Sequence, residues 1–586
     1  MPNNYRHLDN QNEGCRFDPA HFTRGWCLVG LVLSWIIGLG AISLGSFILF
    51  QESRDGKVPA VGHVPTAIRE MLPLVMNIVV TLLNESMGYI HSNALRWSLQ
   101  GEQDEKGDSR LTFNSNLRLF SNSRNSPANS RYSNALFLLC IVLAYASTSM
   151  IFLPWDPYLA AVLNKSNLFD GGDVNAYHIS GVALLVLGVG LSGQAIGSTW
   201  SGFTITPPTW SSNPFETLNA SMTESDNKIS RKPGRCMMSV HQYKREPAAQ
   251  QPKLKQVCAA RAHGQVRIVL AVLWALVPLG AIWGVVTYLM IAKYKNPHGV
   301  LGSSWSFLPL FTGYNDPSTC PAASCTDGTS ILNVGWSLGM GPMPAVGAVF
   351  LIAAFQAALT LALHCAELLV NLSRDEGMFR QMLQEGGADP RRNSIIAAMT
   401  SWQTIILLIS KALCHWLFGL AINVSWGLGV NMYPPQICYL TGFTFLVAIF
   451  ATYVAFRKPK GYLPATYGHL QTMANIVDEY SHSIHWGHKY GLTTGRYNGY
   501  NPFAGTSSRP FKYSVNRNIK YGGPDGLDPA YGNVDVGART AASYASPDPS
   551  LRESNFWESS LHSQPSHTSF RSRESQIPLL SRASLR

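Results

Sequence analysis

Two pairs of ionisable side chains lie in stretches apolar enough to sit inside a bilayer. His364 and Glu367 are three residues apart. Lys411 and His415 are four residues apart, so each pair shares one face of a helix. Counted at about 1.5 Å per residue from one membrane surface, Lys411 lies at a depth similar to that of His364 and Glu367, and Glu85 lies at a comparable depth. Because a lone charge near the bilayer centre costs about 3 kcal/mol on insertion scales, we expect Glu367 or Glu85 to be the counter-ion of Lys411.

These five side chains form a candidate buried polar cluster with two interpretations. The cluster could bind a small-molecule or ion substrate, or it could be a structural clamp between helices. A haem held between His364 and His415 is disfavoured because the two imidazoles lie at different depths. In HSIHWGH, His482, His485 and His488 lack the further ligand that would complete a tetrahedral metal site. We therefore predict no metal site and no cofactor.

The composition indicates a membrane protein. Charged residues make up 13% of the 586-residue chain, about half the share usual in soluble domains, whereas 46% are apolar. The formal charge of +11 could suit nucleic acid, but no helix-turn-helix, RRM signature or zinc-finger spacing presents it, so we expect no nucleic-acid partner. No Walker A or H-E-x-x-H motif occurs, and GVGLSG at 188–193 lies inside an apolar run. No catalytic set is recognisable, which argues against an enzyme.

Eight apolar runs are long enough, at about 20 residues each, to cross a bilayer as helices. They predict an all-α polytopic transmembrane helix bundle over 25–456, with spans at 25–50, 71–90, 134–155, 180–199, 268–291, 345–372, 402–424 and 437–456. With the segment 1–24 in the cytosol, thirty-eight of the 45 Lys and Arg residues fall on the cytosolic side and five outside. We therefore expect both termini to be cytosolic, in an integral protein of the plasma membrane.

Two loops that this topology places outside carry candidate modifications. Asn164 begins the sequon Asn-Lys-Ser and is a candidate for N-glycosylation. Cys320 and Cys325 lie in CPAASC and are a candidate disulfide, the alternative being two unpaired thiols. Both assignments follow from the predicted topology, because the oxidising, glycosylating compartment lies on the outer side.

The cytosolic segments differ from one another. Leu111–Phe120 mixes apolar and basic residues, as an interfacial segment on anionic lipids would. Within the juxtamembrane segment 457–490, apolar residues at helical spacing predict an amphipathic helix. Residues 491–586 are rich in Ser, Gly, Tyr, Asn and Pro and predict a disordered tail, in which Ser575 and Ser584 near arginines are candidate phosphorylation sites.

Three stretches carry a resemblance to a known kind of protein. ESMGYIHSNALRWSL, LTFNSNLRLFSNSR and PATYGHLQTMANIVDEY resemble segments of polytopic membrane proteins of filamentous ascomycete fungi. The likeness covers roughly residues 25–490 and not the tail. It implies a membrane protein of fungal origin, and it implies no activity, substrate or functional residue.

Two classes of function fit these patterns. We favour a transporter or channel-like protein whose path passes the polar cluster, which predicts water access to the cluster. The alternative is a non-transporting receptor or scaffold, in which aromatic outer loops meet a ligand and the phosphorylatable tail signals inside; it predicts a dry, closed bundle. The lipid bilayer, with anionic lipids at the cytosolic face, is the expected partner. The sequence specifies neither a substrate nor an oligomeric state.

Overall fold

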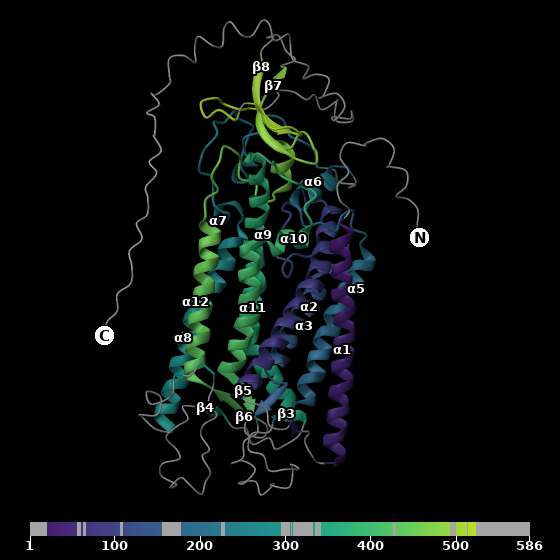
Figure 1. Ribbon diagram of the computed structural model, residues 1–586, viewed down its shortest axis with the longest axis vertical. Helices are drawn as coiled ribbons and strands as arrows, with labels where there is room; N and C mark the ends of the chain where they lie inside the picture. The colour runs from purple at the N-terminus through teal and green to yellow at the C-terminus, as the bar shows by residue number, and fades with distance from the viewer. Residues whose placement is uncertain are drawn as a thin grey trace, which may run out of the picture. The chain divides into compact units, whose positions relative to one another are not determined.

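The computed structural model describes residues 20–55, 60–61, 66–105, 109–154, 177–223, 229–294, 305, 307–308, 332–334, 342–425, 429–492, 500–512 and 514–522. Within these ranges the chain is mostly helical, and eight helices are long and apolar enough to cross a membrane (Figure 1). The prediction of an all-α polytopic bundle with eight spans is thereby confirmed.

The eight long helices contain most of each predicted span. They are α1 (His21–Asp55), α2 (Thr66–Gln100), α3 (Arg131–Thr148), α5 (Gly181–Thr204), α8 (Gln265–Tyr294), α9 (Pro342–Arg380), α11 (Trp402–Ala421) and α12 (Pro434–Phe456). The third and seventh helices end earlier than predicted, where short strands begin. Pro154 disfavours helix in the residue before it, and the β-branched Ile422 and Val424 suit an extended strand.

Successive long helices run in opposite directions, so their connections collect at two ends (Figure 1). One end carries two small antiparallel sheets, and we call it the strand end. The first sheet has the order β1-β3-β2 and the second the order β4-β6-β5. Their strands are β1 (Ala60–Val61), β2 (Phe152–Pro154), β3 (Tyr177–Ile179), β4 (Leu332–Val334), β5 (Ile422–Ser425) and β6 (Gly429–Met432).

At the opposite end, the connections fold into a unit with its own hydrophobic core. We call it the cap: the described parts of residues 101–130, 205–264, 381–401 and 457–522. Its regular elements are η1 (Pro127–Asn129), α6 (Pro214–Thr223), η3 (Val240–Gln242), α7 (Ala259–Ala262), η4 (Gln381–Leu383), α10 (Ser394–Met399), α13 (Leu470–Ile476), β7 (His485–Leu492) and β8 (Tyr500–Ser507). The cap core includes the fully buried side chains of Phe215, Met473, Phe503 and Tyr521.

The cap corrects the predictions for the chain after α12. The amphipathic helix is only seven residues long, and its apolar residues lie in the cap core rather than on lipid. The tail begins later than residue 491, because β8 pairs along its length with β7 and Tyr521 is buried. Strand β8 contains Asn501, Pro502 and Gly505, three residue types that strands disfavour, so this pairing depends on the tertiary context. The remainder of the tail lies outside the described residues.

The prediction that Leu111–Phe120 lies on lipid was also wrong for most of the segment. Leu111 and Leu117 are buried, and the segment lies between the cap and the bundle. The backbone N–H of Asn114 donates to Gly468 O at 2.8 Å, which ties the segment to the chain before α13. Leu111 and Leu117 are covered by protein and make no contact with lipid, whereas Phe120 at the end of the segment is 57% exposed.

The GVGLSG stretch serves helix packing. A Cβ at Gly188 would lie 2.6 Å from the carbonyl oxygen of Gly38, so α5 and α1 touch at their backbones. On the other side of α5, a Cβ at Gly190 would lie 2.9 Å from Cys140 O on α3. Small residues allow such close contact between helices in a membrane.

Asp478 links the β7–β8 hairpin to the end of α13. Its Oδ1 accepts a hydrogen bond from the backbone N–H of Thr506 at 2.5 Å, and its Oδ2 accepts one from Lys489 Nζ at 2.8 Å. Burial opposes ionisation, but Arg231, Lys489 and the hydrogen bonds outweigh it and hold the pKa of Asp478 below its usual range. The carboxylate therefore stabilises the cap above about pH 4, and this stabilisation is lost as the pH falls through the lowered pKa.

We expect Asp478→Asn to loosen the hairpin by about 2 kcal/mol, since hydrogen bonds to a charged group contribute about 1.5–3 kcal/mol each. Limited proteolysis of membranes should show faster cleavage in 485–507 at neutral pH, and the difference from the unsubstituted protein should shrink as the pH falls from about 4 through the lowered pKa of Asp478. Glu246→Gln, at an exposed position of the cap away from the hairpin, is the control and should cleave at the original rate. Equal cleavage of Asp478→Asn and the control would contradict this role.

Candidate functional site

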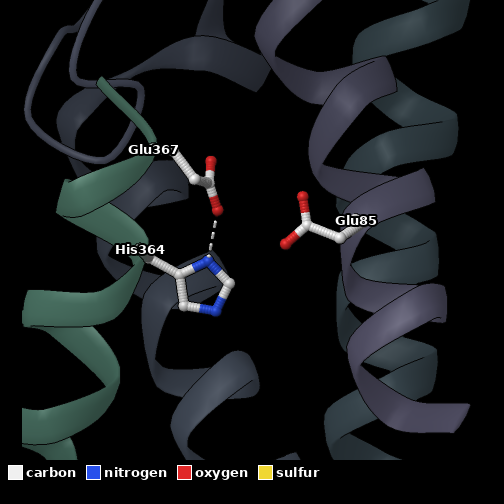
Figure 2. Close-up of side chains that lie close together, drawn as sticks. All are labelled: Glu85, His364 and Glu367. Atoms are coloured by element: carbon white, nitrogen blue, oxygen red, sulfur yellow. Dashed lines mark hydrogen bonds and ion pairs between the residues drawn. The ribbon is translucent and has the colours of Figure 1, made fainter. Parts of the chain in front are cut away.

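The ammonium group of Lys411 joins three helices inside the bundle. Lys411 lies on α11 and is 1% exposed. Its Nζ contacts Oε1 of Glu85 on α2 and Oε1 of Glu367 on α9. Figure 2 shows Glu85 facing Glu367 and His364 across the space between α2 and α9. The lysine thus contacts both of the glutamates that the sequence offered as alternatives.

Arg118 belongs to the same cluster, although the sequence analysis assigned it to a lipid-facing segment. Its Nη2 lies 3.2 Å from His364 Nδ1 and 3.6 Å from Glu367 Oε1. A Cβ at Gly88 would overlap the Arg118 guanidinium, so the glycine on α2 makes room for it. In the sequence, the signal for this packing is Gly88, about one helical turn after Glu85. A glycine shows that there is room beside the helix, but it does not identify the side chain that fills it.

His364 has two alternative partners for one ring nitrogen. Its Nδ1 lies 2.8 Å from Glu367 Oε1 and 3.2 Å from Arg118 Nη2. When Nδ1 carries a proton it can donate to the carboxylate, and when it does not it can accept from the guanidinium. The proton on His364 therefore decides which neighbour it bonds.

The cluster is balanced in charge. Two carboxylates, Glu85 and Glu367, face two cations, Lys411 and Arg118, so the group is neutral when His364 is neutral. The ligand atoms of Glu85, His364 and Glu367 lie within 4.8 Å of one another, a spacing that could hold a metal ion. Because Lys411 already contacts both carboxylates, we interpret the arrangement as an ion-pair network.

A series of buried polar side chains continues from the cluster toward the strand end. On α9, Gln356, Thr360, His364 and Glu367 share one face. Gln356 Nε2 lies 2.8 Å from Nδ1 of His415, the fifth predicted residue, which is one turn beyond Lys411 on α11. At about 1.5 Å per residue, Gln356 and Glu367 are separated by about 16 Å along the helix, roughly half of the hydrocarbon thickness.

Helices α2 and α3 supply the other side of this series. The Tyr145 ring stacks on His415 with centroids 3.6 Å apart, and its hydroxyl donates to Thr81 Oγ1 at 3.1 Å. Thr148 Oγ1 then donates to Asn77 Oδ1 at 2.9 Å, close to the strand end of α3. We call the whole set the polar track: Asn77, Thr81, Glu85, Arg118, Tyr145, Thr148, Gln356, Thr360, His364, Glu367, Lys411 and His415.

Some polar atoms of the track lack a hydrogen-bond partner. Within the described residues, Nε2 of His364, Nε2 of His415 and Oε1 of Gln356 are buried and unpaired. Buried polar atoms of this kind are normally satisfied by water or a ligand. The track therefore offers hydrogen-bonding sites beyond those used to hold the helices together.

The carboxylates are the accessible part of the cluster. The side chain of Glu85 is 34% exposed and that of Glu367 is 19% exposed, whereas that of Lys411 is 2% exposed. Glu85 follows the exposed Ile78 and Leu82 along one stripe of α2. The Glu85 side chain thus lies beside the outward-facing stripe of α2, at the edge of the cluster.

The other predicted sites do not contribute to this cluster. His482, His485 and His488 make separate contacts, with Arg391, Ser483 and Tyr521 respectively. The candidate glycosylation site Asn164, the candidate disulfide Cys320 and Cys325, and the candidate phosphorylation sites Ser575 and Ser584 lie outside the described residues.

The comparison with known proteins adds no further assignment. No protein family, curated protein or solved structure matches the chain.

Proposed function

We propose that this integral membrane protein is a transporter or channel-like protein for a small cation, the proton included. The observation that carries the proposal is the polar track, a set of buried hydrogen-bonding groups that extends from the ion-pair cluster to the strand end of α3. Ionisable groups inside a membrane protein commonly mark an ion or proton pathway. A cation is favoured because the accessible charged groups are the carboxylates of Glu85 and Glu367.

The proposed orientation has the cap and both chain termini in the cytosol, in the plasma membrane. The basic residues support it, since the segments at the cap end hold most of the Lys and Arg residues of the chain. Under this orientation the ion-pair cluster lies in the inner half of the membrane, and the track leads outward from it.

A non-transporting receptor or scaffold is the second candidate. Two observations favour it: the charges of the cluster are balanced, as in a structural clamp, and the cap is a folded unit with a core of its own. On this view the cap would bind partners inside the cell, and the cluster would only hold α2, α9 and α11 together.

Water access separates the two candidates. Thr360 and Ala362 are both 0% exposed on α9, but only Thr360 belongs to the track. In the full-length protein in membranes, we expect a small water-soluble thiol reagent to label Thr360→Cys at least about tenfold faster than Ala362→Cys, because thiol reactivity follows access to water. Labelling would be measured at each site by mass spectrometry.

Equal protection of the two cysteines would indicate a dry bundle, and the transport proposal would then fall in favour of the scaffold. Thermal unfolding of both variants shows whether each remains folded. Both replaced side chains are small, so the comparison tests the surroundings of the two positions rather than their size.

A further inference from the structure

We propose that the outer edge of the cap, where it meets α8 and α12, is a docking surface for anionic phospholipid headgroups. Seven basic side chains define this basic edge: Lys253, Lys255, Arg261, Arg267, Arg457, Lys458 and Lys460. All seven are exposed. Residues 250–267 and 457–463 contain no Asp or Glu.

The four lysines of the basic edge lie on two chain segments that run side by side. Lys255 is paired with Lys460 in an antiparallel bridge, so two like charges are opposite one another. The pairing is held by backbone hydrogen bonds, from Gln256 N to Pro459 O at 3.0 Å and from Gly461 N to Leu254 O at 2.9 Å. Like charges directly opposite are destabilising unless a counter-ion is shared between them.

The described part of the chain places no acidic side chain against these lysines. Within the described part of the chain, none of the seven basic side chains forms a salt bridge. Arg267 is oriented by a hydrogen bond from its Nε to Ala260 O at 3.2 Å, which uses only one of its donors. The surface therefore has unused donors and an unbalanced positive charge.

The position of the basic edge identifies the anion as a lipid headgroup. Arg267 precedes Ile268, which is 61% exposed on α8, and Arg457 follows Phe456, which is 55% exposed at the end of α12. Apolar side chains exposed to this degree on long apolar helices face the hydrocarbon region, and the basic residues begin directly beyond them. Leu254, 52% exposed between two lysines, is placed to enter the interface.

The expected anionic-lipid contact thereby lies on this basic edge rather than on Leu111–Phe120, in which Leu111, Leu117 and Arg118 are buried. It does not depend on the transport proposal, since a scaffold would need the same anchoring.

The test compares the affinity of spin-labelled phosphatidylserine and phosphatidylcholine for the full chain reconstituted in phosphatidylcholine bilayers. We expect the unsubstituted protein to prefer phosphatidylserine by about threefold at low salt, and 0.5 M NaCl to remove most of this preference, because surface charge interactions are screened. Substitution of all four lysines 253, 255, 458 and 460 by glutamine should lower the preference to near one.

The matched control replaces four other basic residues of the cap, Arg509, Lys512, Arg517 and Lys520, by glutamine. It changes the net charge equally and should keep the threefold preference. If the fourfold variant folds poorly, the double variant Lys458→Gln with Lys460→Gln takes its place, and its preference for phosphatidylserine should be intermediate. No preference in the unsubstituted protein, or equal losses in the test and control variants, would overturn the proposal.

Discussion

Replacing Lys411 with methionine will lower the yield of folded protein severalfold. The substitution leaves two carboxylates, Glu85 and Glu367, facing the single cation Arg118. Breaking one side of a buried ion pair costs about 3–5 kcal/mol in soluble proteins, and the cost in a membrane interior is of similar origin. Fluorescence-detected size-exclusion chromatography and thermal unfolding in mild detergent would measure the loss.

The geometry also predicts which second substitution restores the fold. Glu85→Gln in the Lys411→Met background leaves the neutral group of Glu367, Arg118 and His364 intact, so most of the yield should return. Glu367→Gln in the same background leaves Arg118 without its carboxylate and Glu85 without a cation, so it should restore little. Equal rescue by the two glutamines would contradict the pairing, and a neutral Lys411→Met would show that the network contributes nothing.

The second large effect is expected at Glu376, which holds the chain after α12 against the end of α9. Its Oε2 accepts hydrogen bonds from the backbone N–H groups of Thr466 and Tyr467, both at 3.0 Å. Arg380 Nε donates to its Oε1 at 2.7 Å, and the same guanidinium reaches Gly461 O and Pro464 O at 3.2 Å. Tyr467 has a positive φ of 49°, a conformation that these bonds help to maintain.

We expect Glu376→Ala to destabilise the cap by about 3 kcal/mol or more, since it leaves two buried backbone amides and the Nε of Arg380 without their acceptor. Hydrogen–deuterium exchange should rise across 461–477 and in the hairpin while the long helices keep their protection. Glu385→Ala, an exposed glutamate of the cap, is the control and should leave exchange unchanged. If exchange after Glu376→Ala matches the control, the cap is held by its hydrophobic core alone.

The sequence predicted the parts of the structure that follow from hydropathy and depth. Long apolar runs determine helices in a membrane because every backbone group must be paired within its own segment. The same logic placed Glu85, Glu367 and Lys411 at one level, and they are in contact. Because Glu85 and Glu367 lie at the same depth, the sequence could not show which of them pairs with Lys411. In the structure Lys411 contacts both.

Arg118 and the cap could not be predicted in the same way. Arg118 lies in a short segment with no helical or strand period, and it enters the bundle only because Gly88 leaves room. The cap joins stretches far apart in the chain, such as Gln250 with Tyr521 and Ala388 with Ile484. These pairings join segments that are far apart in the chain, and the local composition of a segment does not show which distant segment it will contact.

The separation of Glu85 and Lys411 has a consequence for how the protein is made. They are 326 residues apart. At a synthesis rate of about 5–20 residues per second, Glu85 is complete roughly 15–65 s before its lysine leaves the ribosome. A charged carboxylate would be costly in the membrane during that interval, so the second helix must insert with Glu85 protonated, near the headgroups, or held by an insertion factor. The cation that stabilises the finished bundle arrives too late to assist the early steps of its assembly.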